Sequence, residues 1–264
     1  MSVKRLGVLG WPVGHSRSPQ IFKAAFEGSD LDGWNYQLLP APPAEFGRLV
    51  RGLHGAGFVG ANVTIPHKQA ALAIADSCSF RAEQIGAANL LSFSADGAIV
   101  ADNSDAPGLL AALGEHARAG DSALVLGAGG SARAVLWALR DVGMKVQLWN
   151  RTAARAAALA AEFGVEAVSD AAPAQLLVNC TAAGLDDPGA SFVSLPLTAD
   201  EVGGYATVVD LVYGDQPSAL IESAAAAGSR TIDGREILVQ QGAIAFEHWT
   251  GAAAPLELMR AAAC

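Results

Sequence analysis

Short apolar runs alternate along the chain with segments in which apolar residues recur every three or four positions, a pattern typical of strands followed by helices. In the first part of the chain we expect strands over residues 3–9, 34–38, 59–65, 90–93 and 99–101. Helices are expected there over residues 19–27, 44–55 and 79–84. A tight turn at Asp96 and Gly97 would join the last two strands into a hairpin.

The second part of the chain continues this alternation more regularly. The expected strands cover residues 123–126, 145–149, 165–168, 176–180, 207–212 and 231–234. The expected helices cover residues 109–118, 132–142, 153–163, 217–227 and 235–249. Strands that are apolar throughout and separated by helices predict a parallel sheet with both faces covered. The pattern therefore predicts the α/β class.

A glycine turn joins the strand at 123–126 to the helix that follows it. It consists of Gly127, Ala128, Gly129, Gly130, Ser131 and Ala132. This spacing fits the dinucleotide fingerprint, in which the first glycine allows a tight turn and the second allows the backbone to approach a pyrophosphate. The N-terminus of the next helix would direct free N–H groups at the phosphates. The alternative is an ordinary glycine-rich turn between a strand and a helix.

A basic segment follows the strand at 145–149, and it indicates which of the two nicotinamide cofactors, NAD(H) or NADP(H), the chain would bind. Asn150, Arg151 and Thr152 follow the strand, and Arg155 lies four residues after Arg151. An NAD site carries an acidic residue here, about 20 residues past the glycines, whereas arginine suits a 2′-phosphate. We therefore predict NADP(H) rather than NAD(H), although taken alone the two arginines would fit a solvated helix face.

Composition excludes several other classes of protein. The net charge of −9 and the pI near 4.9 argue against a nucleic-acid partner, which needs a basic surface. No apolar run is long enough for a membrane span, and we expect no secretory signal. Cys78, Cys180 and Cys264 are widely spaced and odd in number, which favours a reducing, cytoplasmic setting. Cys180 is expected to be a small core residue, and no spacing resembles a metal site.

Polar residues of possible functional interest follow the first strand and lie within and just after the third. Ser16 and Ser18 lie in the loop before the first helix, at the sheet edge where small ligands bind, although both could simply cap that helix. Asn62 and Thr64 share one face of an otherwise apolar strand, so they need a protein or ligand partner. Lys68 follows in the first turn of a helix, where an isolated lysine is usually a solvated charge.

A second polar cluster, residues 102–105, precedes the helix expected at 109–118. Asp105 could merely cap that helix. Further along the chain, the paired carboxylates Asp186 and Asp187 lie in a loop and are expected to be solvated.

Several longer motifs occur in a fixed order with the glycine turn. They are HSRSP at 15–19, GANVTIPHK at 60–68, GAANL at 86–90, DNSD at 102–105, NRT at 150–152 and DGREILVQQGA at 233–243. Together they resemble the shikimate dehydrogenase family over nearly the whole chain. The resemblance implies two α/β domains with a cleft between them. The substrate domain would cover residues 1–105 and 237–264, and a Rossmann-type NADP-binding domain would cover 106–236.

The resemblance also implies an activity and a set of site residues. The reaction would be the reversible NADPH-dependent reduction of 3-dehydroshikimate to shikimate in chorismate and aromatic amino-acid biosynthesis. Lys68 and Asp105 would be the catalytic pair. Ser16 and Ser18 would bind the substrate carboxylate, and the ring hydroxyls would be held by Asn62, Thr64, Asn89 and Gln241. Beyond the glycine turn, the cofactor would contact Asn150, Arg151, Thr152, Arg155, Thr181, Leu211, Tyr213 and Gly234.

Four positions depart from the usual family pattern, and they keep alternatives open. Ser104 stands in place of Thr, Ala106 in place of Gly, Leu90 in place of Thr, and Ile237 in place of Met. The loss of a hydroxyl at Leu90 leaves quinate as an alternative substrate. A non-catalytic NADPH sensor would be expected to lose Lys68 or Asp105, and a related enzyme acting on folates fits HSRSP poorly. We expect a monomer or a homodimer, which the sequence does not decide.

Overall fold

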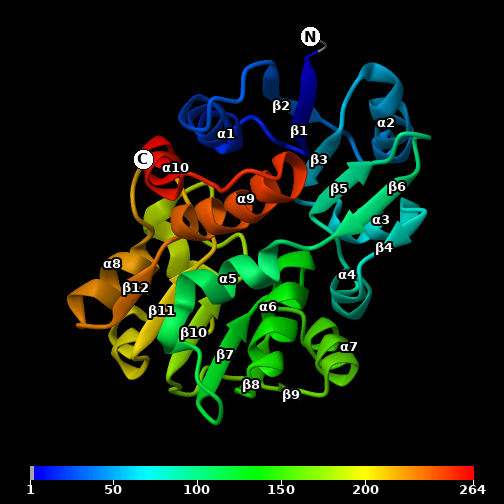
Figure 1. The fold of residues 1–264 in the computed structure, drawn as a ribbon. Helices are drawn as coiled ribbons and strands as arrows, with labels where there is room; N and C mark the ends of the chain where they lie inside the picture. Colours follow the sequence, from blue (N-terminus) through cyan, green and yellow to red (C-terminus); the bar gives the residue numbers. More distant parts are fainter. Residues whose placement is uncertain (1–2) are drawn as a thin grey trace. The chain divides into compact units, whose positions relative to one another are not determined.

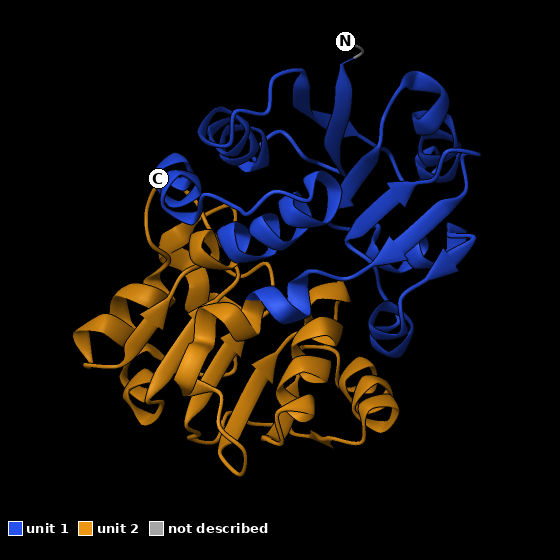
Figure 2. Ribbon diagram, in the orientation of Figure 1, with its two compact units in different colours: residues 1–108, 238–264 blue, residues 109–237 orange. Residues whose placement is uncertain are grey.

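The computed structural model describes residues 3–264 as a mixed α/β protein (Figure 1). The chain divides into two compact units (Figure 2): unit 1 is Met1–Gly108 with Leu238–Cys264, and unit 2 is Leu109–Ile237. The first boundary lies beyond the expected residue 105, because the helix α5 (Asp105–Leu113) begins in unit 1 and continues into unit 2. The α9 helix (Gly234–Thr250) crosses the second boundary in the same way.

Unit 1 contains a six-stranded sheet in the order β2-β1-β3-β5-β6-β4. Its strands are β1 (Lys4–Gly10), β2 (Trp34–Pro40), β3 (Gly60–Val63), β4 (Ser77–Cys78), β5 (Leu90–Phe93) and β6 (Ile99–Asp102). β1 pairs in parallel with β2 and β3, whereas β5 pairs antiparallel with β3 and β6. The antiparallel β5–β6 pair, with Gly97 at φ +85°, confirms the predicted hairpin. Because β5 runs against β3, the start of β5 lies beside the end of β3.

Alternate residues of this sheet face two separate cores, as strand geometry requires. One face carries Leu6, Val8 and Tyr36, which are packed with Phe22 of α1 (Ser18–Gly28) and Phe246 of α9. The opposite face is covered by other helices, including α2 (Phe46–Leu53) and α3 (Lys68–Ile74) (Figure 1). Its core includes Leu9, Val63, Leu91, Phe46, Val50 and Ala71.

Unit 1 contains the helices α1 (Ser18–Gly28), α2 (Phe46–Leu53), α3 (Lys68–Ile74), α4 (Phe80–Ile85) and α10 (Leu256–Ala263), with a 3₁₀ turn at His54–Ala56. Of these, α1, α2 and α4 lie close to their expected ranges and α3 begins at Lys68 as expected, whereas α10 had no expected range of its own. Two expectations need correction. The third strand ends at Val63 rather than at residue 65, because its ladder with β5 stops where β5 begins. The helix expected over 109–118 starts at Asp105 and becomes a 3₁₀ turn at Gly114–His116.

Unit 2 contains a fully parallel sheet in the order β12-β11-β10-β7-β8-β9, which confirms the predicted strand arrangement. Its strands are β7 (Ser122–Leu126), β8 (Lys145–Trp149), β9 (Glu166–Ala167), β10 (Leu176–Asn179), β11 (Thr207–Asp210) and β12 (Arg230–Ile232). Its helices are α6 (Gly130–Asp141), α7 (Ala153–Phe163) and α8 (Ala219–Ala226), with 3₁₀ segments at Pro188–Val193 and Ala199–Gly204. The strand β10 ends at Asn179, so the prediction that Cys180 lies on this strand is wrong. Cys180 is only partly buried, although it was expected to be a core residue. Within residues 3–264, every helix is too short or too polar to cross a membrane.

Candidate active site and cofactor loop

A buried ion pair is the centre of the polar cluster in unit 1. Lys68 is the first residue of α3, and Asp105 is the first residue of α5. The Lys68 Nζ donates to Asp105 Oδ2 at 2.6 Å, and the Lys68 residue is only 9% exposed. A buried lysine paired with a carboxylate contradicts the alternative that Lys68 is a solvated charge. The fold therefore places an ammonium, which can donate a proton, beside a group that orients it.

Asn89 holds the second oxygen of Asp105. Its Nδ2 donates to Asp105 Oδ1 at 2.8 Å, and its Oδ1 accepts the backbone N–H of Ser104 at 2.7 Å. The same Nδ2 lies 3.3 Å from Gln241 Oε1, and Gln241 Nε2 donates to the Leu238 carbonyl at 2.7 Å. Four of the residues expected in the substrate site, Lys68, Asp105, Asn89 and Gln241, thus form one connected cluster.

A glycine allows Gln241 to reach this cluster. A Cβ placed on Gly108 of α5 would lie 2.8 Å from the backbone nitrogen and 2.9 Å from the Cα of Gln241. These separations are shorter than any ordinary carbon contact, so α5 and α9 can approach this closely only with glycine at position 108.

The capping alternative for Asp105 is wrong. The first turn of α5 is capped instead by Asn103, whose Oδ1 accepts the Ala106 N–H at 3.2 Å. Asn103 is fully buried and also donates to the Ala87 carbonyl at 2.9 Å. Because Asn103 caps the helix, the two carboxylate oxygens of Asp105 are directed at Lys68 and Asn89.

Asn62 lies on β3 and is tied to two neighbours. The hydroxyl of Tyr36 donates to Asn62 Oδ1 at 2.8 Å, and Asn62 Nδ2 donates to the Asn89 carbonyl at 3.1 Å. Sequence reasoning missed Tyr36. Its alternation within β2 places it on the buried face, but an apolar role explains that position equally well.

Ser16, Ser18 and Thr64 also lie beyond the carboxyl ends of strands in unit 1. The two serines are buried, and their hydroxyls are 3.2 Å apart. The residue that caps α1, Arg17, makes no side-chain capping bond, although Ser16 Oγ accepts the Ser18 N–H at 3.3 Å. Thr64 is partly buried and follows β3. Parallel strands end at one edge of a sheet, so these side chains lie at the same edge as Lys68.

The glycine turn of unit 2 has the geometry that a phosphate group requires. Gly127 has φ +107°, and a Cβ there would meet the backbone of Cys180 at 3.1 Å. A Cβ on Gly129, which precedes α6, would meet no atom within 4 Å. Open space at Gly129 and the position of the turn at the N-terminus of α6 fit a pyrophosphate. The turn is therefore compatible with the dinucleotide that its sequence predicts.

The basic segment after β8 is exposed. Among residues 3–264, no carboxylate forms an ion pair with Arg151 or Arg155, and both side chains are exposed. The Asn150 Nδ2 donates to the Thr152 carbonyl at 3.0 Å, which shapes the loop before α7. Two exposed guanidinium groups at this position can receive a phosphate dianion.

A second buried carboxylate lies at the end of β11. Asp210 is fully buried; its Oδ1 accepts Asn179 Nδ2 at 2.9 Å and the Val212 N–H at 3.1 Å. Its Oδ2 accepts the Ser218 hydroxyl at 2.5 Å. Burial, reinforced by the Asp233 carboxylate, raises the pKa of Asp210 to about 6, although the three hydrogen bonds oppose this shift. Sequence reasoning did not identify this group: the expected strand ran over 207–212 with Asp210 inside it, whereas β11 ends at Asp210.

The Asp210 network connects loops that carry expected cofactor residues. Asn179 Oδ1 accepts the Thr181 hydroxyl at 2.7 Å, and Thr181 Oγ1 accepts the Ala183 N–H at 3.1 Å. A Cβ on Gly234 would lie 2.5 Å from the Leu211 carbonyl oxygen, so close packing explains that glycine. Leu211, Gly234 and Thr181 are thus fixed in position by their own unit.

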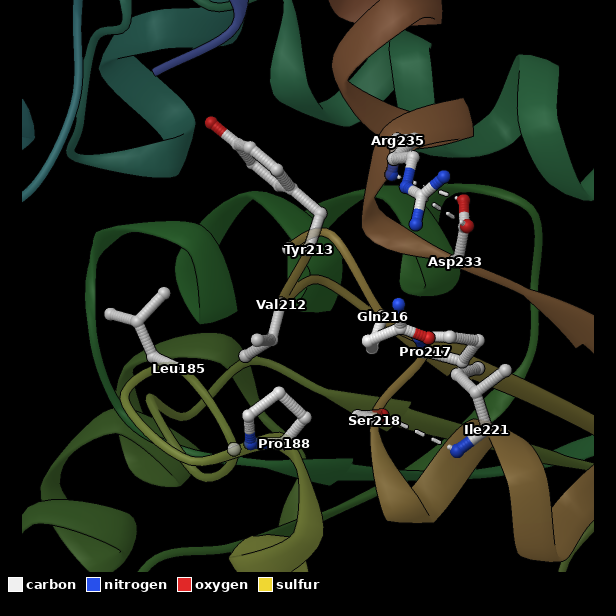
Figure 3. A pocket seen from close by; sticks show the side chains of 12 residues that line it. Leu185, Pro188, Val212, Tyr213, Gln216, Pro217, Ser218, Ile221, Asp233 and Arg235 are labelled. Atoms are coloured by element: carbon white, nitrogen blue, oxygen red, sulfur yellow. Dashed lines mark hydrogen bonds and ion pairs between the residues drawn. The ribbon is translucent and has the colours of Figure 1, made fainter. Parts of the chain in front are cut away.

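A shallow pocket lies beside this network. Its lining residues are Gly184, Leu185, Pro188, Val212, Tyr213, Gly214, Gln216, Pro217, Ser218, Ile221, Asp233 and Arg235. Figure 3 shows Arg235 beside Asp233 at one end and Leu185 with Pro188 at the other. Of the expected cofactor residues, Tyr213 lines this pocket. In the described part of the chain, no three His, Cys, Asp or Glu side chains are grouped as a metal ion would need.

Comparison with known proteins identifies two matching family models. The shikimate dehydrogenase substrate binding domain matches residues 8–91, and the shikimate 5′-dehydrogenase C-terminal domain matches residues 234–264. Both matched segments lie largely in unit 1.

Individual relatives match over nearly the full length. The chain is 44% identical to the NADP(+) shikimate dehydrogenase of Methylobacterium radiotolerans, covering 95% of this chain and 93% of that protein. It is 41% identical to the corresponding protein of Halobacterium salinarum, covering 97% of each. The crystal structure of shikimate 5-dehydrogenase from Thermus thermophilus, in complex with NADP(H) and shikimate, superposes with a TM-score of 0.89 at 40% identity. That match covers 99% of this chain and 98% of the other.

Proposed function

Because the chain belongs to the shikimate dehydrogenase family, we propose that it catalyses the reversible NADPH-dependent reduction of 3-dehydroshikimate to shikimate in chorismate biosynthesis. The observation that carries this proposal is the buried Lys68–Asp105 pair, in which Lys68 Nζ lies 2.6 Å from Asp105 Oδ2. A reductase of this kind needs a proton donor for the carbonyl oxygen, and a non-catalytic sensor has no use for one.

NADPH, when bound, supplies the hydride that reduces the C3 carbonyl. Lys68 donates a proton from Nζ to the carbonyl oxygen, and in the reverse direction its amine removes the hydroxyl proton. Asp105 holds Lys68 through Oδ2, while Asn89 fixes Oδ1, so the ammonium has one preferred orientation. General acid catalysis of this kind contributes about 10²- to 10⁴-fold.

We assign substrate binding to unit 1. Ser16 and Ser18 bind the carboxylate, because their hydroxyls are adjacent and buried beside the N-terminus of α1. The ring hydroxyls are held by Asn62, Thr64, Asn89 and Gln241. The amides of Asn62, Asn89 and Gln241 each have at least two protein partners, which restricts their orientation before a ligand binds.

We assign NADP(H) binding to unit 2. The 2′-phosphate is received by Asn150, Arg151, Thr152 and Arg155, and the pyrophosphate by the turn from Gly127 to Ala132. The nicotinamide end is assigned to Thr181, Leu211 and Tyr213, which lie in loops, and to Gly234, the first residue of α9. We further propose a cytoplasmic location, because three widely spaced cysteines, an odd number, suit a reducing compartment, and a monomer or homodimer as the working form.

The test of this proposal is an initial-rate comparison of shikimate and quinate, each with NADP⁺ and with NAD⁺, followed by the absorbance of the reduced nicotinamide. We expect a strong preference for shikimate with NADP⁺. A preference for quinate would contradict the substrate assignment, and turnover with NAD⁺ alone would contradict the role of the arginines. The absence of turnover with every pair would favour the sensor.

A further inference from the structure

We propose that Tyr36 is a positioning residue that fixes the Asn62 side chain as a hydrogen-bond donor toward the substrate. This inference rests on the proposed function, in which Asn62 binds a ring hydroxyl, and it adds the residue that determines how Asn62 binds. Tyr36 itself lies on β2, two strands away from Asn62 in the sheet order.

The strand register explains how the two side chains meet. Tyr36 is paired with Leu6 of β1, and Asn62 is paired with Val8 of the same strand. Positions 6 and 8 of a strand point to one face of the sheet. Tyr36 and Asn62 therefore lie on the same face, on opposite sides of β1, and the length of the tyrosine ring carries its hydroxyl across to Asn62 Oδ1 at 2.8 Å.

The ring that carries this hydroxyl is held rigidly. It stacks on Phe22, with ring centroids 4.1 Å apart and an interplanar angle of 18°. Tyr36 is 8% exposed and belongs to the main core of unit 1. A rotation of the ring would break this packing, so the hydroxyl stays where Asn62 needs it.

The amide of Asn62 has one acceptor oxygen and two donor hydrogens. The Tyr36 hydroxyl occupies the oxygen, and the Asn89 carbonyl receives one hydrogen at 3.1 Å. These two bonds fix the plane of the Asn62 amide. They also fix its orientation, with Oδ1 toward Tyr36 and Nδ2 toward the Asn89 carbonyl. The oxygen keeps a second lone pair, but the only polar hydrogen of the amide not used in these two bonds is the second N–H. We take this N–H as the group that Asn62 directs at an acceptor oxygen of the substrate.

Tyr36→Phe tests this role because it keeps the stacked ring and removes only the hydroxyl. We expect the KM for shikimate to rise roughly three- to tenfold, as for the loss of one neutral hydrogen bond. The kcat and the KM for NADP⁺ should stay close to their wild-type values. The control is Tyr205→Phe in unit 2, which removes a tyrosine hydroxyl that donates to the Ala172 carbonyl at 3.1 Å; it should leave the KM for shikimate unchanged.

A double-mutant cycle shows whether Tyr36 acts through Asn62. We expect Asn62→Ala to raise the KM for shikimate at least as much as Tyr36→Phe, and the double variant to match Asn62→Ala alone. If the two effects multiply, or if Tyr36→Phe has no effect while Asn62→Ala does, this inference is wrong and the proposed function stands. A wild-type KM in Asn62→Ala would overturn the role of Asn62 in the proposed function, and this inference with it.

Asn62→Asp provides a second variant in which Tyr36 is intact. It retains an acceptor for the Tyr36 hydroxyl but has no N–H groups, so shikimate affinity should fall as far as in Asn62→Ala. Retained affinity would show that Asn62 acts as an acceptor and would overturn the inference. Thermal unfolding of each variant, with and without shikimate, shows that the measured protein is folded.

Discussion

The two units each place a buried or partly buried aspartate at the carboxyl end of a sheet strand, but they give it different partners. Asp105 of unit 1 receives an ammonium from Lys68 and an amide from Asn89. Asp210 of unit 2 receives only neutral donors, from Ser218, Asn179 and the backbone of Val212. A cation beside a buried carboxylate offsets the cost of burying its charge, and neutral donors do so incompletely.

Because their partners differ, the two aspartates have different roles: Asp105 can support a reaction, whereas Asp210 holds loops in position. In unit 1 the partner cation carries a transferable proton, so the pair can take part in a reaction. In unit 2 the carboxyl group connects β10, β11 and α8 through hydrogen bonds, and its raised pKa, about 6, reflects burial without a cation.

The largest effect is expected from Lys68→Ala. It removes the proposed proton donor, so kcat should fall by about 10²- to 10⁴-fold with little change in shikimate affinity. Lys68→Arg keeps the charge but should also fail, because a guanidinium does not release its proton near neutral pH. Steady-state rates and shikimate binding measured on the same preparations check this, and a near wild-type kcat in either variant would remove Lys68 from the mechanism.

Asp210→Asn should change the pH dependence of stability. Below about pH 4 the Asp210 carboxyl is protonated in both the folded and the unfolded chain. As the pH rises through about 6, the folded state must hold a buried charge, so stability present at low pH is lost. Relative to wild type, the variant should therefore gain about 2 to 3 kcal/mol in the free energy of unfolding between about pH 4 and pH 8. Urea unfolding at both pH values measures this gain, and parallel curves for the two proteins would contradict it.

Replacing both Arg151 and Arg155 with Ala should weaken NADP⁺ binding and leave chemistry intact. Loss of charge-assisted hydrogen bonds to a phosphate is expected to raise the KM for NADP⁺ by about 10- to 100-fold, while the KM for NAD⁺ stays the same. Arg118→Ala is a matched control, because this exposed arginine of unit 2 donates to the Glu115 carbonyl, away from the basic segment. An equal increase in the KM for NADP⁺ and for NAD⁺ would show that the two arginines do not bind the 2′-phosphate.

The smallest effect is expected from Ser218→Ala. The Ser218 hydroxyl donates to Asp210 and accepts the Ile221 N–H at 3.3 Å, which caps α8. Its loss should destabilise unit 2 by about 1 kcal/mol, with the larger loss at high pH, where Asp210 is ionised. Thermal unfolding at two pH values measures both effects, and a loss confined to low pH would contradict this reading of the network.

The sequence predicted the elements of unit 2 more completely than those of unit 1, for a physical reason. Parallel strands and crossover helices repeat a local pattern, so β8 and α7 matched their expected limits. Unit 1 includes an antiparallel strand, β5, whose register with β3 brings Asn89 to the sheet edge that carries Lys68 and Asp105. That register arises from pairing between distant segments and leaves no local signal.

The residues of the site could likewise be predicted only where a local motif marks them. Lys68, Asp105, Asn89 and Gln241 could be selected from motifs, but not their hydrogen bonds. The capping function of Asn103, the hydroxyl of Tyr36 and the buried Asp210 each depend on where a side chain points after folding.

Unit 1 is built from two segments of chain separated by the whole of unit 2. A ribosome therefore completes residues 109–237 before it makes Gln241, Val239 or Phe246, which belong to the site and core of unit 1. Domains generally fold as units during synthesis, N-terminal parts first. Here unit 2 has all of its residues first, and the polar cluster around Lys68 is completed only after Gln241 has been made.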